Sequence, residues 1–140
     1  MKNKRPTMEE IYMHLAIELS ERSKCSKAKV GCVIATKDLR KIIGLGYNGY
    51  AKKIDYTCIE EICYCLHAEN NAITSSGSEY TDKVFFVTMM PCFPCTIQII
   101  NSGCSKLYYH SDYKKGSRHW ANYDIIRLLL KRSKIIIKKI

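Results

Sequence analysis

Two short motifs, HAE at 67–69 and PCFPC at 91–95, constrain the fold of this chain more than any other feature of its sequence. The second motif opens the segment 91–103, which begins with prolines and ends with a glycine, the polarity expected of an α-helix. The first motif opens a predicted helix over 67–75, which a glycine soon ends. A fold that joins both motifs in one site must therefore bring the N-terminal ends of two helices together.

The histidine and cysteines of these motifs form a ligand set that zinc prefers. Cys92 and Cys95 lie on one side of a first helical turn, where the helix dipole favours thiolates. Together with His67 they supply three ligands and leave a fourth tetrahedral position for water, as in catalytic zinc sites. Glu69 follows the histidine too closely to bind usefully beside it. We predict that Glu69 instead accepts the proton of that water and delivers it elsewhere.

The cysteine content also allows other interpretations. Eight cysteines are compatible with a disulfide scaffold, but such scaffolds are usually secreted, shorter and loop-rich. The pairs 63/65 and 92/95 have instead the short spacings of metal sites. A CxxC at a helix start is also typical of thioredoxin-type redox pairs. That interpretation expects the pair after a first strand, whereas here it follows a third, and it leaves HAE unexplained.

Helices and strands are predicted to alternate along the chain. Thr7 and Glu10 give a capping-box signal for a helix over 8–22. Its expected apolar stripe consists of Met8, Ile11, Leu15 and Leu19. Strands are expected at 29–36, 41–49, 83–88, 106–110 and 134–140, and a last helix at 122–132. The segment 50–64 has no clear period and is expected to be irregular.

This alternation predicts a three-layer α/β/α sandwich with a mixed five-stranded sheet, built as a single domain over 1–140. No apolar run approaches the roughly 20 residues needed to cross a bilayer, and the N-terminus lacks the pattern of a signal peptide. We therefore expect a cytoplasmic protein with no membrane partner. The net charge of +10 favours anionic partners such as phosphates, nucleotides or nucleic acid.

The paired motifs match the H-x-E…P-C-x-x-C signature of the zinc nucleobase deaminases. Over roughly residues 8–115 the chain resembles the deoxycytidylate (dCMP) deaminase family, especially its phage and viral members. GYNG at 46–49 and HAENNAI at 67–73 are the most family-specific parts. The resemblance implies a cytidine-deaminase-like fold and the zinc-dependent hydrolysis of dCMP to dUMP and ammonia, which feeds dTMP synthesis.

The resemblance also implies roles for individual residues, beginning with the zinc ligands and the proton shuttle assigned above. Asn48 matches an asparagine that contacts the nucleotide sugar, and Tyr113 matches a substrate-contacting tyrosine after the fourth strand. The peptide groups at Ala68 and near Pro91 border the metal and are candidates for holding the base. Three lysines are candidates for the 5′-phosphate: Lys27, Lys29 and Lys114.

Phage members of the family carry a second, structural zinc. Cys25, Cys58 and Cys65 fall where those members place ligands, although Cys65 replaces a glutamate. Cys63 would supply a fourth thiolate. A site of four thiolates is closed to substrate and would attach the 50–64 segment to the core. The alternative is a set of free thiols near the surface.

Members of the family are commonly homohexamers, activated by dCTP and inhibited by dTTP with magnesium. Gly46 and Gly49, with the neighbouring YAKK at 50–53, are the expected effector site, because glycine lets a backbone approach a phosphate closely.

Three other functions share these motifs. A deaminase that acts on dCTP as well as or instead of dCMP would need the same base and sugar contacts. A tRNA adenosine deaminase shares HAE and PCxxC and is favoured by the charge, but GYNG and the second cysteine cluster favour a nucleotide pocket. A non-catalytic zinc-binding nucleic-acid module would have closed zinc sites and no need of Glu69. Nucleic acid is therefore not an expected partner.

Overall fold

The computed structural model describes residues 3–54, 58–59 and 62–140, with the backbone alone at 58 and 59. Its elements follow in chain order: α1 (Met8–Ser20), β1 (Gly31–Ala35), β2 (Ile42–Tyr47), β3 (Cys58–Ile59), β4 (Ile62–Cys63), α2 (Ala68–Ser76), β5 (Lys83–Met89), α3 (Phe93–Asn101), β6 (Cys104–Ser111), the 3-10 helix η1 (Trp120–Asn122), α4 (Tyr123–Arg132) and β7 (Ile136–Lys139). None of the helices in these ranges is long and apolar enough to cross a bilayer.

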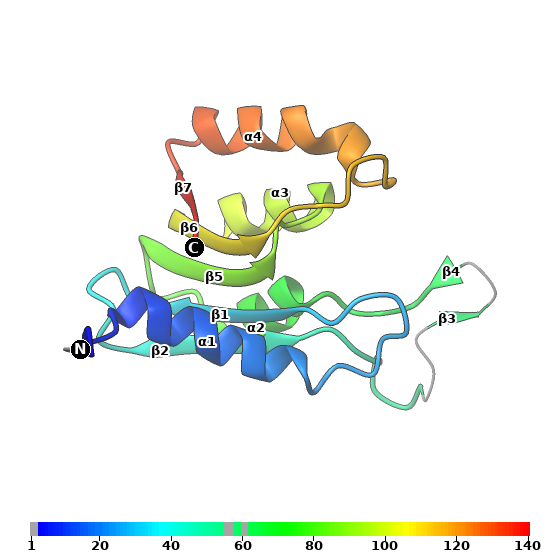
Figure 1. The fold of residues 1–140 in the computed structure, drawn as a ribbon, viewed down its shortest axis with the longest axis horizontal. Coiled ribbons are helices and arrows are strands. Elements are labelled where there is room, and N and C mark those ends of the chain that lie inside the picture. The colour runs from blue at the N-terminus through cyan, green and yellow to red at the C-terminus, as the bar shows by residue number, and fades with distance from the viewer. Residues whose placement is uncertain (1–2, 55–57, 60–61) are drawn as a thin grey trace.

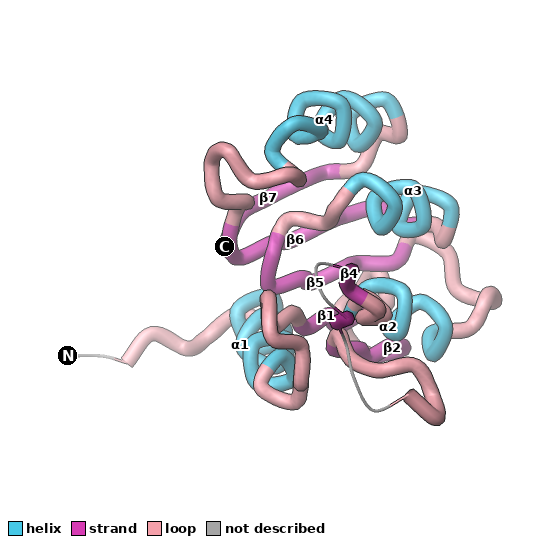
Figure 2. The backbone as a smooth tube through the Cα atoms, turned by 90° about the vertical axis from the view of Figure 1, so that its right-hand side faces the viewer, coloured by secondary structure: helices cyan, strands magenta, loops and turns pink. Residues whose placement is uncertain are grey.

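Five strands form one mixed sheet in the order β2-β1-β5-β6-β7 (Figure 1). β1 pairs antiparallel with both β2 and β5, whereas β5, β6 and β7 run parallel. Helix α1 covers one face of the sheet, and α2, α3 and α4 lie side by side over the other (Figure 2). The predicted three-layer α/β/α architecture with a mixed five-stranded sheet is confirmed.

The two central strands, β1 and β5, supply the core on both faces of the sheet. Side chains alternate between the faces of a strand. Val33 and Phe86 accordingly pack under α1, while Ile34 and Phe85 pack under the opposite helices, and all four are fully buried. The core therefore sits at the middle of the sheet and supports the helices on both sides.

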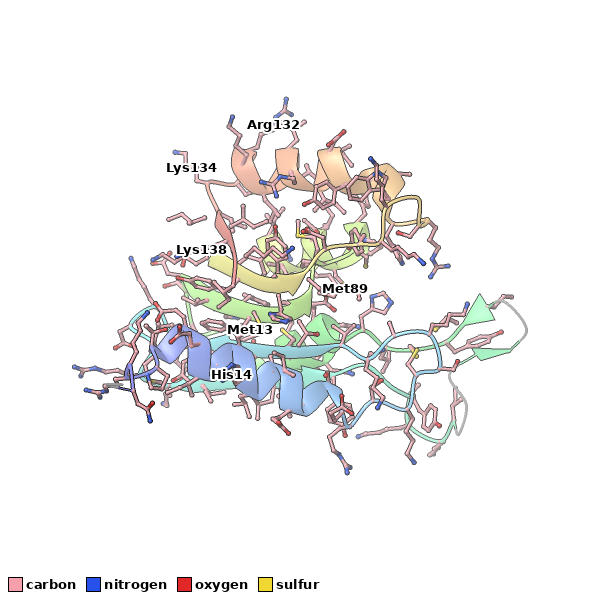
Figure 3. All side chains as sticks on the ribbon, viewed as in Figure 1. Met13, His14, Met89, Arg132, Lys134 and Lys138 are labelled. Carbon is pink, nitrogen blue, oxygen red and sulfur yellow. The ribbon has the colours of Figure 1, made fainter. Side chains whose placement is uncertain are left out.

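The capping box at the start of α1 is present, since Thr7 accepts from the Glu10 N–H and Glu10 accepts from the Thr7 N–H. The expected apolar stripe is only half right. Leu15 and Leu19 pack against the core, but Met8 and Ile11 are 42% and 41% exposed. The fully buried residues of the helix are Tyr12, Met13 (labelled in Figure 3), Ala16 and Ser20.

Close contact between α1 and β1 explains this rotation. A Cβ atom at Gly31 would collide with the Ala16 carbonyl, so the backbones of strand and helix touch here. A small side chain must face the sheet at that contact, and Ala16 is the residue that fits. The spacing of apolar residues in the sequence cannot predict this contact, because the contact depends on residues with small side chains or none.

The 50–64 segment contains a short hairpin where an irregular path was expected. β3 pairs antiparallel with β4, and Cys58 lies opposite Cys63 in the register. Strands of two residues are too short to give a period in the sequence. The hairpin extends from the same end of the molecule at which α2 and α3 begin (Figure 1).

Part of the excess positive charge lies at the opposite end of the molecule. Arg132, Lys134 and Lys138 extend from α4, β7 and the turn between them (Figure 3). Arg132 also stands in the last turn of α4, where a cation stabilises the helix dipole. This basic group therefore lies away from the hairpin end, where α2 and α3 begin.

Two glycines of β2 allow α2 to lie directly on the sheet. A Cβ atom at Gly44 would be 2.5 Å from the Ala72 carbonyl oxygen, and one at Gly46 would be 2.6 Å from the Ala72 nitrogen and closer still to the Ala68 carbonyl. The atoms in the way belong to the helix backbone, which cannot move aside as a flexible side chain can. Gly46 thus places the first turn of α2, which carries Glu69.

We expect Gly46→Ala to lower the free energy of unfolding by about 1–3 kcal/mol, because the added methyl group pushes the first turn of α2 off the sheet. Turnover should fall as well, since Glu69 moves with that turn. Gly49→Ala is the matched control, because no atom lies within 4 Å of a Cβ built at Gly49. Urea unfolding of both variants checks the prediction, and equal stabilities would contradict it.

Candidate active site and metal centres

Two helix N-termini meet above the ends of the central strands. His67 is the N-cap residue of α2 and Cys92 is the N-cap residue of α3, both with extended backbone angles (φ −74°, ψ 150° and φ −69°, ψ 169°). Neither side chain makes a capping hydrogen bond to its own helix. Both are therefore directed elsewhere, and Cys95, in the first turn of α3, joins them.

The three side chains form a compact ligand group. The Nδ1 atom of His67 lies 3.2 Å from Sγ of Cys95 and 3.4 Å from Sγ of Cys92. Tetrahedral zinc with bonds of about 2.0 to 2.3 Å separates its ligand atoms by roughly 3.5 Å. One nitrogen and two sulfurs at these separations fit a zinc ion and leave its fourth position for another molecule.

The cysteines of this group have altered acidity. A hydrogen bond from the Cys95 thiol lowers the pKa of Cys92 to about 4, although burial acts in the opposite direction. The same hydrogen bond, together with burial, raises the pKa of Cys95. Cys92 is therefore a thiolate near neutral pH, and it stands at a helix N-terminus, where thiolates are favoured.

Glu69 follows in the first turn of α2 and is only 4% exposed. Burial raises the pKa of its carboxyl group, and the negative charge of Cys92 acts in the same direction. A carboxyl group whose pKa moves towards neutrality exchanges protons well near neutral pH. Glu69 is outside the ligand group itself, as expected for a proton carrier.

Two members of the ligand group, His67 and Cys92, line one cavity of about 140 Å³ together with Glu69. Met89, at the end of β5, marks its place in Figure 3. Asn48, Ala68 and Tyr113, the predicted substrate contacts, all line it too. Of the three candidate lysines, the structure brings only Lys27 to this cavity. Lys29 is instead ion-paired with Glu21 at 3.0 Å on the surface.

Asn48 connects the cavity to the loop before β1. Its Nδ2 donates to the Ala28 carbonyl at 2.7 Å, and its Oδ1 accepts from the Val30 N–H at 2.8 Å. An amide has two donors and two acceptor positions, so each end keeps one for a ligand. Asn48 thus holds the loop that carries Lys27 and still faces the cavity.

Arg118 and His119 also line the cavity, and sequence reasoning missed both. They follow β6 in a long loop, and neither lies in a motif with a known spacing. The His119 ring stacks on Tyr113 with centroids 5.3 Å apart, and its Nε2 accepts from Nε of Arg118 at 3.3 Å. Their position close behind Tyr113 is the one signal that could have indicated them.

The second predicted cluster is also assembled. The sulfur atoms of Cys25, Cys63 and Cys65 lie within 4.8 Å of one another. The fourth expected ligand, the Cys58 side chain, lies outside the described residues, but its backbone is opposite Cys63 in the hairpin. These three cysteines form part of the wall of the same cavity. Three thiol groups at this spacing are a second zinc-type donor set.

A separate hollow of about 480 Å³ contains the predicted effector residues Gly46 and Gly49. It also includes Arg22, which lies 6.0 Å from the centre of the Tyr47 ring, and Lys24, which lies 5.7 Å from that of Tyr50. The two cations make this hollow suitable for an anionic ligand.

Comparison with known proteins places these residues in a family. Residues 6–111 match the family model of the cytidine and deoxycytidylate deaminase zinc-binding region. The chain belongs to this family. Zinc is the metal of the family, in agreement with the donor sets of both cysteine groups.

Individual members of the family are similar over most of the chain. The deoxycytidylate deaminase of Mycobacterium phage D29 is 30% identical over 124 residues, which cover 75% of this chain and 95% of the phage protein. That of Schizosaccharomyces pombe is 29% identical and covers 81% of this chain, and the chain spans 40% of its length. The dCMP deaminase of cyanophage S-TIM5, in complex with dCMP and dUMP, has a TM-score of 0.79 at 26% identity, covering 99% of this chain and 100% of that one.

Proposed function

We propose that this chain deaminates dCMP to dUMP and ammonia. The observation that carries the proposal is a single cavity lined by the buried Glu69 and by His67 and Cys92, which form a metal-ligand group with Cys95. The similarity to deoxycytidylate deaminases of phage and yeast supports the choice of substrate. The product would feed dTMP synthesis.

The reaction forms a bond between C4 of cytosine and the oxygen of water, and breaks the bond between C4 and its amino nitrogen. Zinc, when bound, acts as a Lewis acid and lowers the pKa of water. Glu69 accepts the proton of the water and delivers it to N3 of the base. The same carboxyl group then takes the second proton, from the new hydroxyl group on C4, and passes it to the amino nitrogen, which leaves as ammonia while the C4 carbonyl forms. The N–H group of Ala68, in the first turn of α2, has no partner within the helix and is free to hold the base.

We also propose that the second cysteine group holds a structural zinc. Cys25 precedes β1, while Cys63 and Cys65 flank the end of the hairpin, so a shared ion would connect the two segments. Cys58 would complete four thiolates. Such a site is closed to substrate, and its binding free energy stabilises the fold.

Regulation and assembly are proposals of the same kind. We infer that dCTP, and dTTP with magnesium, bind in the hollow that contains Gly46 and Gly49, because Arg22 and Lys24 suit a polyphosphate there. We infer a single domain over 1–140 and a homohexamer. Exposed apolar side chains on α3 and α4, among them Ile97 and Leu128 at 44% and 45% exposure, are available for contacts between copies.

One experiment tests the substrate and the metals together. Zinc content per chain is measured alongside ammonia release from dCMP, dCTP, CMP, deoxycytidine and a tRNA substrate. We expect two zinc ions and preferred turnover of dCMP. One zinc ion per chain with the same turnover would support the proposed dCMP deaminase activity and refute the structural zinc site. Turnover of tRNA alone, or of none of these, would overturn the proposed function.

A further inference from the structure

We propose that Arg118, together with Lys27, binds the 5′-phosphate of the substrate and so selects a nucleotide over a nucleoside. This inference rests on the proposed function, since it names the group that the same cavity recognises. Among the described residues that line the cavity, Arg118 and Lys27 are the two lysine or arginine residues. They come from opposite halves of the chain, one before β1 and one after β6.

The burial of the lining residues places the phosphate at the mouth. Glu69 and Cys92 are buried, whereas Lys27 and Arg118 are exposed. The cavity of about 140 Å³ is smaller than the roughly 300 Å³ or more of pockets that enclose a whole drug-sized ligand. A nucleotide with its base at Glu69 must therefore extend its phosphate outwards, past the side chains that carry positive charge.

The surroundings of Arg118 orient it and leave it available. Its Nε donates to Nε2 of His119 at 3.3 Å. The guanidinium group has five N–H donors, and this bond uses one of them. Three ion pairs occur among the described residues, and Arg118 is in none of them. A guanidinium group held at one nitrogen presents its other donors to a phosphate in a fixed fork.

A second, independent feature indicates a ligand at this place. Tyr113 is 7% exposed, and its hydroxyl group is buried without a hydrogen-bond partner among the described residues. Buried hydroxyl groups are nearly always paired, so an unpaired one that lines a cavity indicates a missing partner. His119 stacks on this ring and bonds to Arg118, so the same stack of side chains positions both groups.

The test compares kcat/KM for dCMP with kcat/KM for deoxycytidine in the Arg118→Gln variant. We expect the ratio of the two to fall roughly ten- to hundredfold, because a charge-assisted hydrogen bond to the phosphate is lost. The lower kcat/KM for dCMP should come mainly from a higher KM for dCMP. Lys115→Gln is the matched control, since Lys115 is exposed in the same loop and does not line the cavity. It should leave the ratio unchanged.

An unchanged ratio, or equal losses on both substrates with the zinc content retained, would overturn the role of Arg118. If Arg118→Gln does not fold, Arg118→Lys keeps the charge without the fork and should give an intermediate ratio; a ratio equal to that of the natural chain would also overturn it. If the natural chain deaminates neither compound, the proposed function fails separately. Calorimetry with dUMP and deoxyuridine then decides: tighter binding of dUMP that Arg118→Gln removes supports the phosphate site, and equal binding refutes it.

Discussion

Glu69→Gln should lower kcat for dCMP by about 10⁴-fold, the upper end of the range for general acid–base catalysis. The upper end is expected because one carboxyl group serves several proton transfers, from the water to N3 and then to the leaving amine. Glutamine has nearly the same shape and fills the same buried position, but it cannot exchange a proton. Stopped-flow or steady-state assays of ammonia release measure the loss.

The zinc content of this variant should stay unchanged, since Glu69 is outside the group formed by His67, Cys92 and Cys95. Glu18→Gln is the matched control, because Glu18 is exposed on α1 and does not line the cavity. A glutamine variant that keeps more than a tenth of the activity would refute the shuttle role. Loss of zinc from the variant would instead make Glu69 a ligand.

The placement of the candidate site residues was predictable because their signals are local. HAE and PCFPC each begin a helix, and a helix start fixes the direction of its first side chains within a few residues. Once both helices lie on the same face of the sheet, His67 and Cys92 have little freedom to be elsewhere. The alternation of strands and helices predicted the layers for the same reason, since each element is recognised by its own period.

Features that depend on contacts between distant segments were not predictable. Arg118 and His119 reach the cavity through a loop whose path depends on the stacking of His119 against Tyr113. Lys27 and Lys29 are only two positions apart in the sequence, yet Lys27 lines the cavity and Lys29 forms an ion pair with Glu21. In a loop, side-chain direction follows no period. The predicted face of α1 was wrong at Met8 and Ile11 for a related reason, because a backbone contact at a glycine decides which side of the helix is buried.

Cys95→Ser should remove the catalytic zinc and lower turnover of dCMP at least about 10³-fold, because an oxygen ligand replaces a thiolate in a group of three and the activation of water is lost. Cys63→Ser should also remove one zinc, from the other group, but lower turnover less than about tenfold, since a structural ion acts through stability. Its unfolding temperature should fall clearly. Zinc analysis, ammonia release and thermal unfolding of both variants make the comparison.

Zinc analysis alone cannot distinguish a catalytic from a structural ion, because each of the two variants should lose one of two zinc ions. Comparing the turnover of Cys95→Ser and Cys63→Ser distinguishes the two roles. Cys104→Ser is the control for the substitution itself, since Cys104 is partly buried and belongs to neither group. It should keep both ions. Equal losses of turnover in Cys95→Ser and Cys63→Ser would mean that the two groups do not act separately. That result is physically reasonable only if the second ion shapes the cavity whose wall Cys63 forms. Full zinc and full turnover in Cys63→Ser would refute the structural zinc site.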